Sequence, residues 1–171
     1  MKRADDKYVM EEWIKPSINR MAKAIGIPRM GRYAYSPLMV DASLHLKAIL
    51  KVAVKAATAA NRKTIQPEDV LLLINTFTGP TIVHDTEYLP KYPFKRNIIM
   101  KAKELGDKLR FAPEVFDILR KFTETHILTL LNMCLVLLNN TKRVTLMTRD
   151  AYLVSDSMEH CGISTGAYRT W

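Results

Sequence analysis

The feature that most constrains this fold is a loop motif that occurs twice in the chain. It reads NRKTIQPEDV at residues 61–70 and TKRVTLMTRDA at residues 141–151. Each copy contains Arg-x-Thr, followed by an acidic residue seven positions after the Arg. Because so short a match can arise by chance, the flanking segments decide whether it marks a duplicated unit. The matched pairs are Arg62 with Arg143, Thr64 with Thr145, Ile65 with Leu146, and Asp69 with Asp150.

The flanks of the first copy predict a short, a long and a short helix. Pro16 opens a stretch whose apolar residues recur at helical spacing until Gly26. Ser36 and Pro37 then supply an N-cap and a first-turn proline for a long helix that keeps one face apolar until about residue 60. After the motif, PEDVLLLIN at 67–75 begins with proline and acidic residues, which the first turn of a helix favours.

The second copy has flanks of the same kind, so the motif marks a unit used twice. Residues 92–105 have helical spacing, Pro113 opens a long helix through Leu138, and Thr148 is a candidate N-cap for a last helix. Both units are helical, which predicts an all-α protein whose β-structure is limited to brief pairing of loops. The expected segments are a short N-terminal segment (1–15), a first unit (16–75), a connector (76–91), a second unit (92–158) and a C-terminal tail (159–171).

The charge of the chain narrows the class of partner. Lys and Arg total 26 against 17 Asp and Glu, a net charge of +9, which suits nucleic acid or an anionic membrane surface. A basic enzyme is an alternative that charge alone leaves open. A membrane-surface protein is disfavoured because the apolar stripe on the long helix of each unit would be covered by the other unit and not by lipid. The chain begins without an apolar signal segment, and its longest apolar run, 127–138, is shorter than the roughly 20 residues that span a bilayer.

Residues of catalytic or metal-binding type are present, but their spacing does not favour such chemistry. The histidines lack mutual metal spacing, and the two cysteines form no disulfide framework, which suits a reducing compartment. The sequence EHC at 159–161 places Glu, His and Cys side by side, yet adjacent residues of a helix do not face one another. Glycine-rich phosphate loops are missing. We therefore predict no enzyme, no catalytic residue, no metal site and no cofactor. The residues concerned are His45, His84, His126, His160, Cys134 and Cys161.

The repeated helix–loop pattern resembles the histone fold. The first half is similar to core histone H-four, through PSINRMAKAIGIPR at 16–29 and NRKTIQPEDVLLLI at 61–74. The second half is similar to core histone H-three, through YPFKRNI at 92–98, KLRF at 108–111 and TKRVTLMTRD at 141–150. A fused pair in this order resembles the doublet histones of giant DNA viruses more than the separate eukaryotic chains. Three departures are the near absence of Lys-rich tails, a connector in place of the helix before the H-three core, and the added C-terminal tail.

The resemblance implies that the two halves clasp into an intramolecular heterodimer with three basic sites for DNA. The second loop of each half is expected beside the first loop of the other, with the short-helix N-termini at the middle. Arg29 and Arg110 are expected to enter the minor groove, and Thr64 and Thr145 to donate hydroxyls to phosphates. The alternative for isolated surface cations is a solvated face. The expected DNA-binding residues are Arg62, Lys63, Thr64, Arg110 and Phe111 at one end, Arg29, Arg32, Lys142, Arg143 and Thr145 at the other, and Arg20, Lys23 and Arg96 in the middle.

The Arg-to-Asp spacing of the motif predicts a loop clamp. Arg62 can reach Asp69 across the loop, into the first turn of the following helix, and Arg143 can reach Asp150 in the same way. If the pairs are exposed, each contributes under about 1 kcal/mol, so their expected role is to hold the loop geometry.

The second long helix predicts self-association. Between residues 127 and 138 it is apolar around its circumference, and one facing helix cannot cover it. A second copy of the chain would complete a two-fold four-helix contact, unless the connector or the tail covers this surface. By position in the family motif, the contact contains Leu137, Asn140, Asp150 and Leu153, with Asn140 where cellular H-three carries a His.

The function implied by the resemblance is that of a viral core histone that wraps double-stranded DNA without sequence specificity. Its expected partners are DNA, a second copy of itself and a companion doublet of the H-two-B with H-two-A kind that docks around Val70–Asn75; no membrane partner is expected. The expected location is the virion and the host nucleus or viral factory. The competing interpretation is a histone-fold transcription factor pair of the CCAAT-binding or TFIID kind, which would bind DNA or regulators without repeated wrapping.

Overall fold

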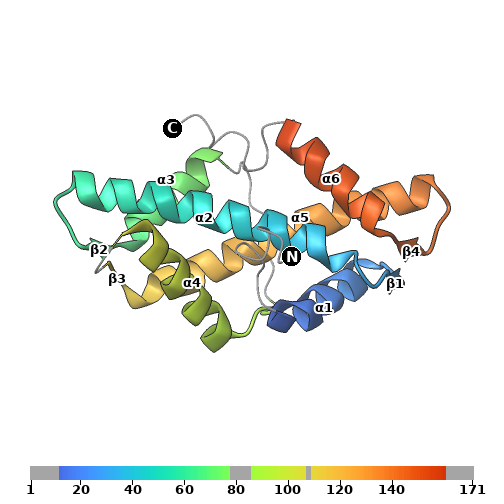
Figure 1. Ribbon diagram of the computed structural model, residues 1–171, viewed down its shortest axis with the longest axis horizontal. Helices are drawn as coiled ribbons and strands as arrows, with labels where there is room; N and C mark the ends of the chain where they lie inside the picture. The colour runs from blue at the N-terminus through green and yellow to red at the C-terminus, as the bar shows by residue number, and fades with distance from the viewer. Residues whose placement is uncertain (1–11, 78–85, 107–108, 161–171) are drawn as a thin grey trace, which may run out of the picture. The chain divides into compact units, whose positions relative to one another are not determined.

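A computed structural model describes residues 12–77, 86–106 and 109–160 of the chain (Figure 1). The first half contains a 3-10 turn η2 (Glu12–Ile14) and the helices α1 (Lys15–Ile25), α2 (Tyr35–Ala59) and α3 (Pro67–Phe77). The second half contains α4 (Lys91–Leu105), α5 (Pro113–Asn140) and α6 (Thr148–His160). The order short, long, short occurs in each half, so the all-α prediction is confirmed.

Strand structure is limited to four two-residue segments in the described residues. These are β1 (Arg29–Met30), β2 (Thr64–Ile65), β3 (Arg110–Phe111) and β4 (Thr145–Leu146). β1 pairs with β4 and β2 pairs with β3, both in parallel. Each pair therefore joins a loop of the first half to a loop of the second half, as predicted.

Local sequence accounts for both ends of α1. Gly26 ends α1 with a φ of 100°, a left-handed conformation that glycine adopts without a side-chain penalty, and its N–H donates to the carbonyls of Ala22 and Lys23. Pro16 lies in the first turn of α1, where its missing N–H costs no hydrogen bond. The long helix α2 begins at Tyr35, one residue before the expected N-cap Ser36.

The chain divides into two compact units that do not coincide with the two halves of the sequence. Unit 1 comprises Met1–Leu44 and His126–Trp171, and unit 2 comprises His45–Thr125. Unit 1 thus contains α1, β1, β4 and α6, and unit 2 contains β2, α3, α4 and β3; α2 and α5 each contribute one part to each unit. Every unit is built from segments of both halves.

The core of unit 1 consists of apolar side chains from four helices and includes one buried polar cluster. Asp41 of α2 is 4% exposed. Its Oδ1 contacts His126 Nε2 at 3.3 Å, and its Oδ2 accepts a hydrogen bond from Ser155 Oγ at 2.9 Å. His126 is therefore a partnered core histidine. The fully or almost fully buried apolar side chains of this unit include Ile18, Met21, Leu38, Leu130, Leu131, Cys134, Ala151 and Met158.

The core of unit 2 is apolar as well, with His45 of α2 stacked on Phe122 of α5 at a centroid distance of 5.1 Å. Its buried side chains include Leu46, Leu50, Ala53, Ile65, Val70, Phe94, Ile98, Val115 and Leu119. His84 and the side chain of His160 lie outside the described residues.

The end of the connector is bound to α5 within unit 2. Glu124 is 1% exposed and accepts hydrogen bonds from the backbone N–H groups of Tyr88 at 2.9 Å and Leu89 at 2.7 Å. Arg120, also buried, donates to the carbonyl of Leu89 at 3.3 Å and to the Glu87 carboxylate at 2.8 Å. Buried charged groups are tolerated when they are paired in this way.

The apolar run at residues 127–138 is one part of the longer helix α5. Within the described residues, α5 is long and apolar enough to cross a membrane, and 56% of its most apolar window is buried inside the protein. A buried core helix has the same length and composition. One side of the helix remains open, since Val136 is 59% exposed and Leu135 and Leu137 are half-buried.

Candidate nucleic-acid interface

The first candidate site is the loop pair β2–β3 in unit 2. Thr64 lies opposite Arg110 and Ile65 opposite Phe111. The pair is held by hydrogen bonds of 3.0 Å from Arg110 N to the Lys63 carbonyl and from Ala112 N to the Ile65 carbonyl. Ile65 is fully buried, which fixes the strand to the core, while Arg110 and Lys63 are exposed.

The second candidate site is the loop pair β1–β4 in unit 1. Arg29 lies opposite Thr145 and Met30 opposite Leu146. Gly31 N donates to the Leu146 carbonyl at 2.8 Å, and a Cβ at Gly31 would lie 3.0 Å from that same oxygen. The close approach of two backbones therefore leaves little room for a side chain at this position.

The two sites share their backbone geometry in detail. Asn61 and Lys142, which are equivalent in the repeat, both have positive φ values, 55° and 52°. Directly after them, Arg62 N donates to the Ala57 carbonyl and Arg143 N to the Leu138 carbonyl, at 2.9 and 3.1 Å. A left-handed residue followed by this backward bond is a common way to end a helix. The repeat seen in the sequence is therefore a repeat of loop conformation.

Arg62 forms the predicted ion pair with Asp69. Its Nη2 donates to Oδ1 at 2.8 Å and its Nη1 to Oδ2 at 3.1 Å, a bidentate geometry that also fixes the orientation of both side chains. Asp69 Oδ2 accepts a further hydrogen bond from Gln66 N at 2.9 Å, and Arg62 Nη1 donates to the Thr64 carbonyl at 3.2 Å. The clamp therefore links the loop to the first turn of α3.

The second clamp repeats this arrangement with Arg143 and Asp150. Nη2 donates to Oδ1 at 2.7 Å and Nη1 to Oδ2 at 2.9 Å, while Met147 N donates to Oδ2 at 2.9 Å. Here the arginine has a different third partner, since Nε donates to Thr141 Oγ1 at 3.1 Å. Both predicted ion pairs are thus present.

The clamp carboxylates are charged at neutral pH although their side chains are largely buried, with exposed fractions of 7% for Asp69 and 5% for Asp150. Burial alone would raise the pKa of each carboxyl, but the hydrogen bonds from the paired arginine and from one backbone N–H outweigh it and hold each pKa below its usual range. The same pairing raises the pKa of the Arg62 and Arg143 guanidinium groups.

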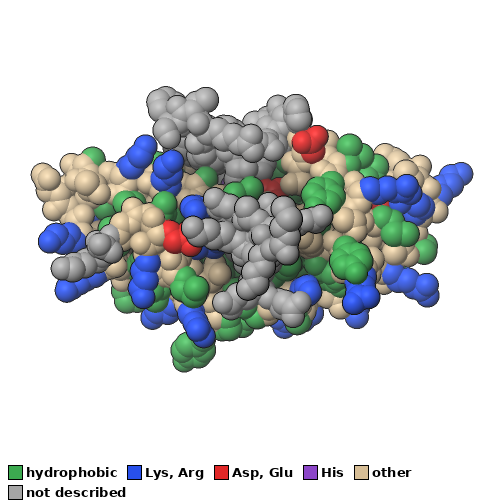
Figure 2. Space-filling model, in the orientation of Figure 1, with side chains coloured by type: hydrophobic (Ala, Val, Ile, Leu, Met, Phe, Trp, Pro, Cys, Tyr) green, Lys and Arg blue, Asp and Glu red, His purple; other side chains and the backbone are tan. Residues whose placement is uncertain are grey.

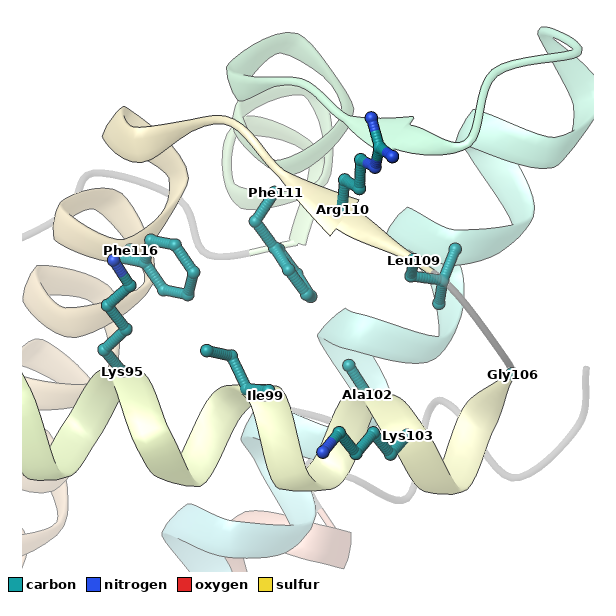
Figure 3. Close-up of a pocket in the computed structure, with 9 residues that line it drawn as sticks. All are labelled: Lys95, Ile99, Ala102, Lys103, Gly106, Leu109, Arg110, Phe111 and Phe116. Atoms are coloured by element: carbon teal, nitrogen blue, oxygen red, sulfur yellow. The ribbon is translucent and has the colours of Figure 1, made fainter.

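The predicted DNA-binding side chains divide into exposed and engaged groups. Arg29, Arg32, Lys63, Arg110 and Lys142 are exposed. The guanidinium groups of the two clamp arginines, in contrast, are partly occupied by their aspartates. Phe111 is also engaged, because its ring contacts Phe116 at a centroid distance of 5.3 Å, and Figure 3 shows it pointing away from Arg110.

The residues of the predicted middle site belong to both units. Arg20 and Lys23 lie in unit 1 and Arg96 lies in unit 2. Arg20 donates to Ser17 Oγ at 3.3 Å, and Lys23 occupies the last turn of α1, where a cation faces the negative end of the helix dipole. Lys23 is therefore far along the helix from the N-terminus that was expected to bind phosphate.

Two features of the sites were not predicted from the sequence. Lys95 of α4 lies with its Nζ 4.9 Å from the centre of the Phe116 ring, beside the β2–β3 loop pair. Gly31 lies where the backbones of β1 and β4 approach closely, and its place directly after the Arg29–Met30 pair was the available signal. On the face drawn in Figure 2, Lys and Arg side chains are numerous and acidic side chains few. Within the described residues, no group of three His, Cys, Asp or Glu side chains could hold a metal ion.

Comparison with known proteins identifies the fold. The structure is similar to the crystal structure of the histone from Methanopyrus kandleri, with a TM-score of 0.65 and 17% sequence identity. The match covers 82% of this chain and 91% of that chain, so it extends over both halves of the sequence described above. No protein-family model matches the sequence, and no curated protein is similar to it. At this identity the likeness concerns the fold, which is a histone fold.

Proposed function

We propose that this protein is a core histone of the doublet type that binds and wraps double-stranded DNA without reading its sequence. The observation that carries the proposal is the pairing of loops across the two halves. It brings an exposed arginine next to a threonine twice, as Arg110 with Thr64 and as Arg29 with Thr145. Guanidinium and hydroxyl groups are typical donors to DNA phosphates, and contacts to phosphates carry no sequence information.

The clamps support this proposal through the shape and charge of the loops. Because Arg62 and Arg143 are held by Asp69 and Asp150, the charges of the buried carboxylates are neutralised inside the loop. The exposed Lys63 and Lys142 on the same loops then leave each site with a net positive surface. We assign direct phosphate contacts to these lysines, insertion into the minor groove to Arg29 and Arg110, and a positioning role to the clamp arginines.

The test of DNA binding is the double substitution Arg29→Ala with Arg110→Ala, measured on a panel of unrelated duplexes. Binding should weaken by a similar factor on every duplex, and the slope of log K against log salt should fall by about 0.9 for each phosphate that the variant no longer binds. The matched control is Lys51→Ala with Lys55→Ala, which removes the same charge from the exposed side of α2. An equal loss of affinity in the control, or a loss on one duplex alone, would reject the assigned sites.

Packaging is separated from transcription-factor function by nuclease digestion of long DNA reconstituted with the protein. Repeated long protected fragments support wrapping. Protection of single short sites would favour the alternative of a histone-fold factor of the CCAAT-binding or TFIID kind, which the common fold equally permits.

The proposed partners account for two exposed apolar surfaces. On α6 and the end of α5, Leu153 is 54% exposed and Val136 59% exposed, which fits a contact with a second copy of the chain. On α3, Leu71 and Leu72 are 42% and 68% exposed, which fits docking of a companion doublet of the H-two-B with H-two-A kind. If this protein alone protected the same length of DNA as the mixture, the companion would be unnecessary.

The resemblance of the two halves to H-four followed by H-three supports a giant-virus origin, with the protein in the virion and in the host nucleus or viral factory. An antibody against the chain should then detect it in purified particles together with DNA. Its absence from particles would contradict a packaging role in the virion.

A further inference from the structure

The contacts at the two loop pairs do not distinguish the first half of the chain from the second. Equivalent residues of the two halves lie 81 positions apart, the spacing of the two loop motifs. Arg29 is equivalent to Arg110 and Thr64 to Thr145, so each loop pair places the same arginine opposite the same threonine. Each clamp joins residues of one half and forms whichever halves pair. Two first halves could therefore join their loops as well as two unlike halves do.

Within each unit, a contact between the two long helices does distinguish the halves. His45 of α2 and His126 of α5 are equivalent residues, and both are almost fully buried. Their partners are equivalent in sequence but differ in chemistry. His45 stacks on Phe122 at a centroid distance of 5.1 Å, whereas His126 Nε2 lies 3.3 Å from Asp41 Oδ1. The same position of the repeat is thus aromatic in unit 2 and acidic in unit 1.

Asp41 also binds a second residue of the other half. Ser155 Oγ of α6 donates to Asp41 Oδ2 at 2.9 Å, so both carboxylate oxygens have a partner from the second half. An ionised carboxylate only accepts hydrogen bonds, so His126 Nε2 carries the proton in this contact. Because Asp41 is 4% exposed, water cannot readily replace either partner. Asp41, His126 and Ser155 are called the pairing cluster below.

A pair formed by two first halves would deprive Asp41 of the serine hydroxyl. Its Oδ1 would still meet an imidazole, that of His45 in the other copy. The residue equivalent to Ser155 is Ile74, however, and an aliphatic side chain has no hydrogen to donate. A pair of two second halves would have the complementary fault, because Ser155 would meet Phe122 there. Each lost hydrogen bond to a buried carboxylate lowers an equilibrium constant by at least about tenfold.

An exposed ion pair has the same preference. Lys47 of α2 donates to Glu104 of α4 at 3.1 Å, and the residue equivalent to Glu104 is Lys23. Two first halves would therefore place Lys47 beside Lys23 of the other copy, where like charges repel. Because exposed ion pairs contribute little, the larger part of the discrimination lies in the buried pairing cluster.

We propose that the pairing cluster makes each first half pair with a second half and not with another first half. Apolar burial cannot make this choice, because it is non-directional and both halves present the apolar faces of one repeat. A buried polar cluster can fix which surfaces pair while it contributes little net stability. The selection acts within the protein and does not depend on the proposed DNA binding.

The test compares the native cluster with a symmetrised variant, Asp41→Phe with Ser155→Ile. These substitutions give the first long helix and the last helix the residues that the repeat has at the equivalent positions, so the two units no longer differ there. Replacement of a buried polar cluster by apolar residues is often neutral for stability, so urea should unfold the variant at a similar or higher concentration. A purely structural cluster predicts a lower midpoint and unchanged pairing.

A disulfide reports mispairing directly when both proteins also carry Arg29→Cys and Thr64→Cys. In the correctly paired chain, residue 29 lies opposite Thr145 and residue 64 opposite Arg110. Two first halves would instead place residue 29 of one copy opposite residue 64 of the other. Paired strands lie about 4.8 Å apart, which is within reach of a disulfide. Mass spectrometry then measures the fraction of chains joined by a disulfide between residues 29 and 64.

The expected fractions follow from the covalent link between the halves. Each half meets its own partner at an effective concentration on the order of 1 mM. After refolding of the full chain at about 100 µM, roughly a tenth of the symmetrised chains should carry the disulfide. The native cluster should lower this fraction at least about tenfold. Dilution of the variant to about 10 µM should lower its fraction about tenfold, because closure within one chain is independent of concentration.

Two further variants serve as controls. Ser157→Ile makes the same substitution on the exposed side of α6, where Ser157 Oγ donates to the Leu153 carbonyl, and should leave the disulfide at the wild-type level. Ser155→Thr keeps the hydroxyl and should do the same. Circular dichroism establishes that each variant is folded.

If the symmetrised variant does not fold, Ser155→Ala takes its place, since it removes only the hydroxyl at a half-buried position. This variant should also raise the disulfide fraction, because Asp41 then has the same single imidazole partner in like and unlike pairs. Equal fractions in the folded variant and in the wild-type cluster would overturn the proposal. The proposed function would survive that result, because no DNA is present in the measurement.

Discussion

Removal of the Asp69 carboxylate should open one loop pair and leave the other intact. Asp69 accepts three hydrogen bonds, two from Arg62 at 2.8 and 3.1 Å and one from Gln66 N at 2.9 Å. Loss of the acceptor for a backbone N–H at a helix start costs about 1 kcal/mol. The two hydrogen bonds from the charged Arg62 are lost as well, so Asp69→Ala should lower the free energy that holds the loop closed by about 2 kcal/mol in total. This exceeds the value for an exposed pair because the carboxylate is buried.

Amide hydrogen exchange can measure this loss of stability at the loop itself. Arg110 N and Ala112 N donate across the β2–β3 pair, so they report its opening directly. A loss of about 2 kcal/mol corresponds to a decrease of about 30-fold in their protection. Gly31 N, which donates to Leu146 across the β1–β4 pair in unit 1, serves as the internal control and should keep its protection.

The variant Asp150→Ala should give the reverse pattern, with weaker protection at Gly31 and unchanged protection at Arg110 and Ala112. Two results would refute this explanation. Unchanged protection at Arg110 in Asp69→Ala would mean that the clamp does not hold the loop. An equal decrease at both loop pairs would mean that the carboxylate supports the stability of the whole chain and not the geometry of one loop.

Three further predictions concern pH, thiol reactivity and self-association. Because the pKa values of Asp69 and Asp150 are lowered in the folded protein, their stabilisation should be complete above about pH 4 and should decline as pH falls through the folded values; Asn at both positions should flatten this dependence in urea titrations. Burial, together with the nearby Asp150 charge, raises the pKa of Cys134 to about 12, so its alkylation near pH 8, followed by mass spectrometry, should be slow until the protein unfolds. Rapid alkylation of the folded chain would contradict this burial. Light scattering should find two copies of the wild type and one of the folded variant Leu137→Arg with Leu153→Arg; a wild type that is monomeric both free and on DNA would reject the two-fold contact.

The helices, the repeat and both clamps could be predicted because their determinants are local. Asp69 and Asp150 lie seven residues from their arginines, so spacing alone indicates that the pairs can form. Helix ends follow from residues such as Gly26, whose conformation depends mainly on its own lack of a side chain. The pairing of loops across the halves required one additional argument, that the apolar face of each long helix needs a cover.

The interactions that sequence reasoning missed join residues far apart in the chain. Glu124 binds the backbone of Tyr88 and Leu89 at sequence separations of 36 and 35, and no local pattern marks that relation. The contact between Lys95 Nζ of α4 and the Phe116 ring of α5, at 4.9 Å from the ring centre, likewise joins residues far apart in the sequence. The contact of the Phe111 ring with Phe116 was not predicted either, and the placement of Phe111 at the DNA site stays a prediction.

The composition of each unit from segments of both halves has a consequence for assembly. Separate histone-type chains must find one another in solution, and their pairing is reversed by dilution. Here the partner segments are covalently joined, so each half meets the other at a fixed effective concentration, on the order of millimolar for a short linker, at any protein concentration. Each chain contains one copy of each half, so the two halves are always produced in a 1:1 ratio. A gene for such a chain therefore supplies paired units in equal number from a single translation product.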